Sequence, residues 1–422
     1  MLWIATPLAA QNQPDVTAIA RAFAEFDGIC KESGERLWGQ PLCGRILLVD
    51  ARTRTAFANH PDPARKFEKK EELYAGPLPP DMLIANTATN WDGEQWAMVM
   101  LPLPVERFHR IRLLAHESFH RLQPALGLRA ADTLSAHLEI ESGRLWLRLE
   151  LRALAEALRT QGVPSRTAAK DALLFRAARH TLSPGAQKLE SALEIQEGLA
   201  EYTGTVTALA AAGESITRVA GAVEDTEDQR AFARSFAYAT GPALGILLDR
   251  FAPSWRKSIT KDSNLAALLA AALQAAVPAA DVKRAESRAE RYGFRAVSVE
   301  ERARAIRAQA VLAAYRKRFL EGPVLEFPQS PELNRSFNPN NLVPLGDLGV
   351  VYPTGTFTSR WGKLQVDDVG ALLSPDNQSL RVAAPANLDA RPLRGPGWRL
   401  ELAPGWTIRP AAQPGSFTLA PE

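Results

Sequence analysis

The segment Leu113–Gln123 contains the single His-Glu-x-x-His sequence of the chain, formed by His116, Glu117 and His120. Because residues four apart lie on the same face of an α-helix, a helix here directs both imidazoles toward one point. Glu117 is rotated by roughly 100° from His116, so its carboxylate can reach a water molecule beside a metal without binding the metal itself. The segment therefore predicts a helix that carries half of a divalent-metal site together with a general base.

The residues around this motif favour one helix over 104–123. Pro104 is tolerated in a first helical turn, and Pro124 ends the helix. An apolar stripe at helical spacing predicts the face that packs on the rest of the protein: Phe108, Ile111, Ala115, Phe119 and Leu122.

Hydrophobic periodicity divides the chain into four parts and predicts an α+β fold. Residues 1–10 are uncharged and mostly apolar and resemble the remnant of a signal peptide. We expect an N-terminal α/β part with a small sheet at 11–103, a largely helical part at 104–321 and a β-rich C-terminal domain at 323–422. The last boundary follows a shift in composition toward Pro, Gly and Asn after Glu321.

Within these parts, the pattern predicts the following elements. Helices are expected at 13–31, 132–161, 165–180, 185–212, 225–251, 264–276 and 299–320. Strands are expected at 44–49, 55–58, 81–86 and 94–101, and in the C-terminal part at 350–352, 363–366, 398–402 and 406–408. Residues 95–101 are our candidate for an edge strand that pairs with an extended peptide substrate beside the metal.

Charge and composition exclude several function classes. The net charge of +3 is small for a chain with 50 basic and 47 acidic residues, so nothing predicts a nucleic-acid partner. No apolar run is long enough to predict a membrane span. We expect an exported protein, in which Cys30 and Cys43 would pair, whereas in the cytoplasm they would be two ordinary thiols.

A zinc site with two His needs a third protein ligand and an open position. Two carboxylates compete for this role. Glu139 lies nineteen positions after His120, whereas Glu197 lies much later, in Glu197-Gly-Leu-Ala-Glu201-Tyr202.

The segments at 116–120 and 197–202 together resemble the gluzincin family of zinc metallopeptidases, in particular its thermolysin and aminopeptidase N branches. There, a second helix supplies the ligand Glu, often within Asn-Glu-Gly-x-Ala-x-Tyr. The resemblance implies a zincin-like catalytic domain with Glu197 as third ligand and Glu201 orienting the first His. The segment Tyr238-Ala-Thr-Gly241 is similar to a family segment whose Tyr stabilises the oxyanion, which implies that role for Tyr238.

This chain departs from the family in two respects. The interval between His120 and Glu197 is much longer than in those branches, and Glu139 has the aminopeptidase-like spacing without the sequence context, so it remains the alternative ligand. A Gly-Ala-Met-Glu-Asn type segment, which captures a free N-terminus in aminopeptidases, does not occur. The resemblance therefore does not support exopeptidase specificity.

Together these observations predict a zinc-dependent hydrolase, a metallopeptidase that cleaves peptide or protein substrates. Zinc would activate water, Glu117 would take the proton, and Tyr238 would donate to the oxyanion. The alternative is a non-catalytic binding or scaffold protein that keeps the metal-site helix for structure and uses the β domain for interactions.

Overall fold

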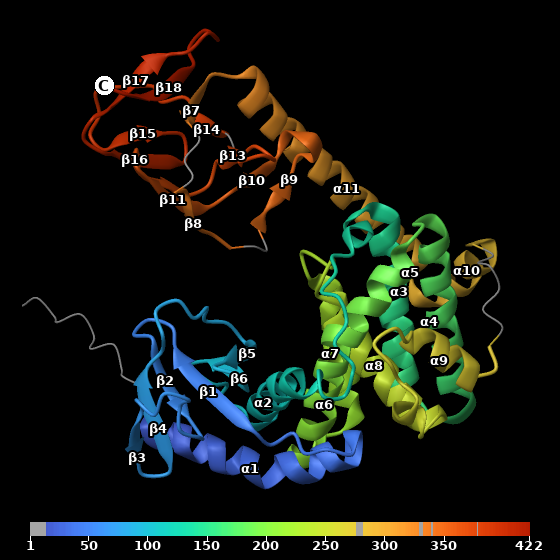
Figure 1. The fold of residues 1–422 in the computed structure, drawn as a ribbon. Helices are drawn as coiled ribbons and strands as arrows, with labels where there is room; N and C mark the ends of the chain where they lie inside the picture. The colour runs from blue at the N-terminus through green and yellow to red at the C-terminus, as the bar shows by residue number, and fades with distance from the viewer. Residues whose placement is uncertain (1–13, 276–281, 329–331, 339–340, 378) are drawn as a thin grey trace, which may run out of the picture. The chain divides into compact units, whose positions relative to one another are not determined.

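The computed structural model describes residues 14–275, 282–328, 332–338, 341–377 and 379–422. Helices and strands are mixed, with a mainly helical region followed by a β-rich C-terminal region, which confirms the coarse fold class predicted from the sequence (Figure 1). The chain forms two compact units, one ending at Glu301 and the other beginning at Arg302. The leader expected at 1–10 lies outside the described residues.

The described residues of the first unit form one six-stranded sheet. Its strands are β1 (Arg45–Asp50), β2 (Thr55–Ala58), β3 (Glu68–Lys70), β4 (Leu73–Pro77), β5 (Thr87–Trp91) and β6 (Glu94–Met100). They are arranged in the order β3-β4-β2-β1-β6-β5. The pair β1 and β6 is parallel, and the other neighbours are antiparallel.

The sheet ends at β3 on one side and at β5 on the other. Strand β6 is not an edge strand, because it lies between β1 and β5. The prediction that residues 95–101 form an edge strand is therefore wrong. The strand expected at 81–86 is irregular instead, and the true hairpin partner of β6 begins at Thr87. The tight turn at Asp92 and Gly93, both with positive φ, fixes this register because the hairpin closes directly around it.

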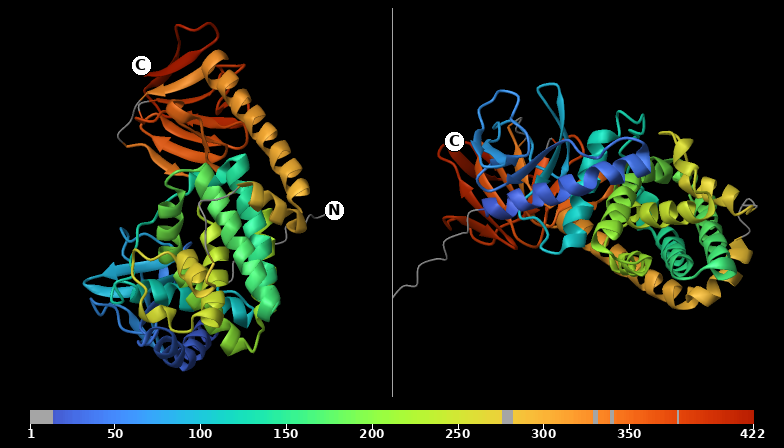
Figure 2. Two further views of the ribbon diagram at one scale, coloured as in Figure 1. Left: turned by 90° about the vertical axis from the view of Figure 1, so that its right-hand side faces the viewer. Right: turned by 90° about the horizontal axis from the view of Figure 1, so that it is seen from below.

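Helix α1 (Val16–Trp38) covers one face of the sheet, as the view from below shows (Figure 2). The Asp15 side chain caps its first turn by accepting hydrogen bonds from two backbone N–H groups, and Gly39 ends it in the left-handed conformation. Its apolar residues at helical spacing, including Phe23 and Phe26, are buried in the core.

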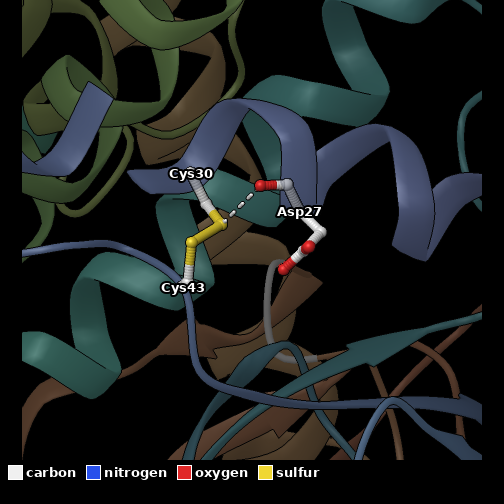
Figure 3. A group of neighbouring side chains, drawn as sticks. All are labelled: Asp27, Cys30 and Cys43. Carbon is white, nitrogen blue, oxygen red and sulfur yellow. Dashed lines mark hydrogen bonds between the residues drawn. A yellow bond between two sulfur atoms is a disulfide. The ribbon is translucent and has the colours of Figure 1, made fainter. Parts of the chain in front are cut away.

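A disulfide joins Cys30 in α1 to Cys43, just before β1 (Figure 3). Asp27 lies beside the pair, but both sulfurs are oxidised, so this group offers no thiolate to a metal. The disulfide attaches the second half of α1 to the start of the sheet.

In the residues that the structure describes, ten α-helices follow the sheet in chain order. They are α2 (Arg107–Leu122), α3 (Glu141–Arg159), α4 (Gly162–Leu182), α5 (Ala186–Leu193), α6 (Leu199–Ala212), α7 (Ile216–Asp225), α8 (Phe236–Phe251), α9 (Leu265–Ala272), α10 (Val282–Ala289) and α11 (Phe294–Arg316). Short 3-10 or π-helical turns connect or extend several of them, and no described helix has the length and apolar character that crossing a bilayer requires.

One long helix expected from the sequence begins later in the structure, and another is interrupted. The helix expected at 132–161 begins only at Glu141, and the one expected at 225–251 is the end of α7 and all of α8, separated by an irregular segment. The helix expected at 185–212 is continuous, but a π-helical turn, Glu194–Gly198, joins α5 to α6; we call it the π-turn. Such turns insert one extra residue and occur frequently at functional sites.

One hydrophobic core joins the sheet to the helices of the first unit. It includes Phe26 of α1, Leu48 of β1, Ile111 of α2, Tyr202 of α6 and Leu244 of α8. The sequence suggested separate parts at 11–103 and 104–321, whereas the structure forms a single unit across residue 103. The reason is that β1 is buried on both faces, so the sheet is completed only by packing on the helices.

A network of buried charges lies between α3, α4, α5 and the π-turn. Arg176 donates to Glu150 at 2.6 Å and to both oxygens of Glu194 at 2.6 and 2.8 Å. Arg179 donates to Glu190 at 2.6 and 2.8 Å and to Glu150 at 2.7 Å. All five side chains are buried. We call these five side chains the ion network. One of them, Glu194, belongs to the π-turn, which also carries Glu197.

Two imidazoles complete the surroundings of Glu190. Nε2 of His137 lies 2.6 Å and Nε2 of His180 lies 3.0 Å from its carboxylate oxygens. Burial alone would raise the pKa of Glu190, but the charge of Arg179 and the hydrogen bonds hold it well below its ordinary value. Glu190 is therefore a buried anion that depends on its cationic partners.

The second unit is a pair of β-sheets that share a core. Its strands are β7 (Val324–Pro328), β8 (Asn334–Ser336), β9 (Val343–Pro344), β10 (Val350–Tyr352), β11 (Gly355–Ser359), β12 (Gly362–Val366), β13 (Ala371–Leu373), β14 (Ser379–Ala383), β15 (Leu393–Gly395), β16 (Trp398–Leu402), β17 (Trp406–Pro410) and β18 (Phe417–Pro421). The sheets have the orders β17-β18-β7-β14-β13-β10-β9 and β15-β16-β12-β11-β8. Trp361 and Trp398 are buried between them.

The ion network predicts unequal costs for two similar substitutions. Replacing Glu190 with Gln leaves buried Arg179 without one of its carboxylates, and we expect a loss of about 3 kcal/mol in the free energy of unfolding. Replacing Glu224 with Gln, which breaks the partly exposed pair with Arg159, should cost about 1 kcal/mol or less. Urea denaturation of the metal-free variants measures both costs, and equal losses would contradict a role for the buried network.

Candidate metal centre

His116 and His120 of α2 lie beside Glu197 of the π-turn, and one potential ligand atom from each lies within 4.8 Å of the others. The two Nε2 atoms are 3.1 Å apart. Glu197 Oε2 lies 3.8 Å from Nε2 of His116 and 3.5 Å from Nε2 of His120. Ligand atoms on a tetrahedral zinc ion are separated by about 3.3 Å, given bonds of about 2.0–2.1 Å. The three side chains therefore have the spacing of a zinc ligand set.

Glu201, one turn after Glu197, fixes the ring of His116. Nδ1 of His116 donates to Glu201 Oε2 at 2.8 Å, and Arg112 of α2 forms an ion pair with the other oxygen. Because the carboxylate only accepts, the proton of the imidazole is on Nδ1, and the lone pair of Nε2 faces the other candidate ligands. This is the role expected for Glu201 from the sequence.

Gln123 fixes the ring of His120 in the same way. Its amide nitrogen donates to the carbonyl groups of Ile195 and Gln196 at 3.0 Å each, so its amide oxygen faces His120. Nδ1 of His120 therefore donates to Gln123 Oε1, at 2.8 Å. Gln123 is 1% exposed, and it connects the orientation of His120 to the backbone of the π-turn.

These two hydrogen bonds direct both Nε2 lone pairs at one point. While both rings are neutral with the proton on Nδ1, neither Nε2 atom can donate to the other, although only 3.1 Å separates them. A cation between them and Glu197 removes this repulsion. The donor set of two imidazoles and one carboxylate is also one that catalytic zinc sites use. The residues present therefore fit zinc.

The π-turn sets the position of Glu197 within the helix formed by α5 and α6. The backbone N–H of Leu199 donates to the carbonyl of Glu194, five residues earlier. Glu194 is held by Arg176 and by the hydroxyl of Thr240 in α8, which donates at 2.6 Å. The ion network and α8 therefore both stabilise the turn that presents Glu197.

Two glycines allow α8 to approach this turn closely. A Cβ on Gly241 would lie 2.3 Å from the Cα of Gly198, which no real side chain tolerates. The contact brings Tyr238, one turn before Gly241, to the candidate ligands. Its hydroxyl donates to Glu197 Oε2 at 2.6 Å, and its ring is parallel to that of His116.

The candidate ligands line a cavity with a volume of about 610 Å³, and Glu117 lines it too. Its Oε2 atom is buried and has no hydrogen-bond partner in the part of the chain that the structure describes. Burial raises the pKa of Glu117; the two imidazoles oppose this shift, and the charges of Glu197 and Glu201 reinforce it. An unpaired carboxylate with a raised pKa beside a candidate metal site has the properties of a general base.

The pKa values of the other site residues agree with their contacts. Burial alone would raise the pKa of Glu197, but its interactions with His120, Tyr238 and His116 lower it to about 2. Burial of His116 opposes protonation, but Glu201 and the nearby carboxylates outweigh it and raise the pKa. Burial and the charge of Glu197 raise the pKa of Tyr238, which keeps its hydroxyl protonated as a donor.

Glu139, the alternative ligand, is not brought to the His pair. Its carboxylate accepts hydrogen bonds from the backbone N–H groups of Phe232 and Ala233 at 2.6 and 2.8 Å and faces Arg144 at 3.7 Å. The structure therefore favours Glu197. The spacing of Glu139 was misleading because residues 132–135 are not helical and α3 starts only after Glu139.

Several residues of the site were not identified from the sequence. Gln123 lies three positions after His120 and thus on the same helical side, which is a usable signal. Arg112 lies four positions before His116 and thus on the same side of the helix, which is a second usable signal. Arg234 lies 3.5 Å from Glu197 Oε1 and also pairs with Asp132, and neither contact has a signal in the sequence because both join distant segments.

Comparison of the chain with protein-family models, with curated proteins and with solved structures gave no match. The likeness to gluzincins therefore remains a prediction, based on the motifs and on the arrangement of the residues described above.

The contacts of Gln123 predict its effect on metal affinity. Gln123→Met keeps the approximate volume but removes the acceptor for His120 and the donor to the π-turn. We expect zinc to bind about 10- to 100-fold more weakly, as measured by competition with a chromophoric chelator. Gln187→Met, at an exposed position of α5, is the matched control and should bind zinc like the unmodified protein. Equal affinities in the two variants would contradict the role of Gln123.

Proposed function

We propose that the protein is a zinc-dependent hydrolase, a metallopeptidase with a zincin-like catalytic domain in the unit that ends at Glu301. One observation carries the proposal: His116, His120 and Glu197 converge, with both Nδ1 protons engaged by other residues, beside a buried and unpaired Glu117. A structural zinc site has four protein ligands. Three ligands with an adjacent base in a cavity are instead the arrangement of a catalytic site.

The residues of the cavity have distinct roles in this proposal. Zinc, when bound, would supply a Lewis acid that polarises the scissile carbonyl and lowers the pKa of water. Glu117 accepts a proton from the attacking water and passes it to the leaving amine. The hydroxyl of Tyr238, which lines the same cavity, would donate a hydrogen bond to a developing oxyanion. Glu201 and Gln123 keep the two imidazoles in one orientation.

Strand β5 supports a peptide as the substrate. It is an edge strand, and Thr87 and Ala88 at its start line the cavity together with His116 and Glu117. The backbone of an edge strand has unpaired N–H and C=O groups that can pair with an extended chain. The substrate main chain would thus bind along β5, in place of the strand expected from the sequence.

We also propose that the protein is exported. The Cys30–Cys43 disulfide supports this, because disulfides persist in oxidising compartments and are rare in the cytoplasm of most organisms.

Glu117→Gln tests the proposed reaction. The change removes the proton acceptor while it preserves size and leaves the candidate ligands intact. We expect unchanged zinc content by inductively coupled plasma mass spectrometry and a loss of at least about 100-fold in the hydrolysis of casein or a peptide library. A chelator should abolish the activity of the unmodified protein, and zinc should restore it.

Glu35→Gln, at an exposed position of α1, is the matched control and should retain activity. Retained hydrolysis in Glu117→Gln would contradict the assigned base. An unmodified, zinc-loaded protein that cleaves none of these substrates would favour the scaffold alternative.

A further inference from the structure

The cavity beside the candidate ligands has few apolar groups. Apart from the ring of Tyr238, its apolar lining residues are Ala88, Leu113, Pro124 and Ala130. The remaining lining side chains are charged or polar. A large apolar substrate side chain would bury little apolar surface against such a wall and would gain correspondingly little free energy. The lining instead favours a polar or charged group of the substrate.

Positive charge exceeds negative charge around this cavity when a dication is bound. The lining contains three guanidinium groups, of Arg112, Arg129 and Arg234, and four carboxylates, of Glu117, Asp132, Glu197 and Glu201. The three guanidinium charges and the two charges of the dication exceed the four carboxylates by one, even with every carboxylate ionised. A bound substrate anion would balance this excess.

Among the described residues that line the cavity, Arg129 carries the guanidinium that remains available. Arg112 is paired with Glu201, and Arg234 is paired with Asp132 and Glu197. Arg129 is exposed and has no ion pair or hydrogen bond to another described residue through its side chain. Its guanidinium can therefore bind a substrate anion without first breaking an existing pair.

The backbone on both sides of Arg129 is fixed to the metal centre. The N–H of Leu128 donates to the carbonyl of Gln123 at 3.0 Å, and Leu128 is buried. The N–H of Ala130 donates to the side chain of Gln196 at 3.1 Å. Gln123 follows the helix that carries His120, and Gln196 precedes Glu197. The backbone of Arg129 is thus held at a defined position beside both candidate ligand segments, which keeps its guanidinium within reach of the cavity.

We propose that Arg129 binds a carboxylate of the substrate and that the protein acts on peptides with an acidic residue close to the scissile bond. This inference depends on the proposed peptidase function, which it extends to a substrate class. A substrate carboxylate has two sources, an Asp or Glu side chain and the free C-terminus, and a matched set of peptides distinguishes them.

The test uses one peptide sequence in three forms: with an internal Glu and an amidated C-terminus, with Gln in place of Glu, and with Gln and a free C-terminus. Binding is measured by fluorescence anisotropy on zinc-loaded Glu117→Gln protein, which holds the peptide without turnover. We expect the Glu peptide to bind at least about fivefold more tightly than its Gln counterpart. The preference should decrease with added salt, because the pair is partly exposed.

Arg129→Gln in the same background should remove this preference, and Arg129→Lys should restore part of it. Arg166→Gln, which removes an exposed arginine of α4 outside the cavity, is the matched control and should leave the preference unchanged. Equal binding of the three peptides, or a preference that survives Arg129→Gln, would overturn the proposal. If only the peptide with a free C-terminus binds more tightly, the site binds a terminal carboxylate, and the proposal of an acidic substrate side chain is overturned.

Hydrolysis of the same peptides by the protein with Glu117 intact separates the two proposals. If the protein cleaves the Glu and Gln peptides with equal kcat/KM, the peptidase proposal stands and the acidic preference is wrong. If binding depends on Arg129 but no peptide is cleaved, the carboxylate site stands as a binding site and the peptidase proposal is wrong.

Discussion

Two hydrogen bonds between side chains set the orientation of the two imidazoles at the centre of the candidate site. Glu201 and Gln123 each accept from an Nδ1–H group, so both Nε2 atoms present lone pairs at a separation of 3.1 Å. Without these acceptors, either ring could turn or change tautomer, and the two imidazoles would no longer form one site. The proposed metal centre therefore depends on residues that do not themselves bind the metal.

The surrounding helices stabilise this arrangement from several directions. The π-turn presents Glu197 and is held by the ion network through Glu194, while the close contact of Gly198 with Gly241 brings Tyr238 to the same point. Replacing the buried charges with well-packed apolar residues would often not reduce stability. We infer that the ion network specifies the geometry of the π-turn.

The features that could be predicted from the sequence are those set by residues close together along the chain. The His-Glu-x-x-His motif requires a helix to be meaningful, so His116, Glu117 and His120 could be grouped without any tertiary information. The context of Glu197 and Glu201 within one helical turn was also readable. The C-terminal strands at 350–352 and 398–402 have the limits that were predicted, and at 398–402 the alternation of buried and exposed residues reflects one face packed between the two sheets.

Other features depend on contacts between distant segments and had no local signal. The identity of the edge strand follows from the order of pairing, and the prediction for 95–101 failed because β5 was missed. The spacing of Glu139 was compatible with a ligand, but its carboxylate caps backbone N–H groups near Phe232 instead. The π-turn and the partners of Arg234 likewise arise only when α5, α6 and α8 have packed.

The most direct test of the metal centre is a zinc-edge anomalous difference map from crystals of the zinc-loaded protein. We predict one strong peak about 2.0–2.2 Å from Nε2 of His116, Nε2 of His120 and a carboxylate oxygen of Glu197. A map without a peak between these three side chains, or with zinc held by another set of residues, would contradict this account.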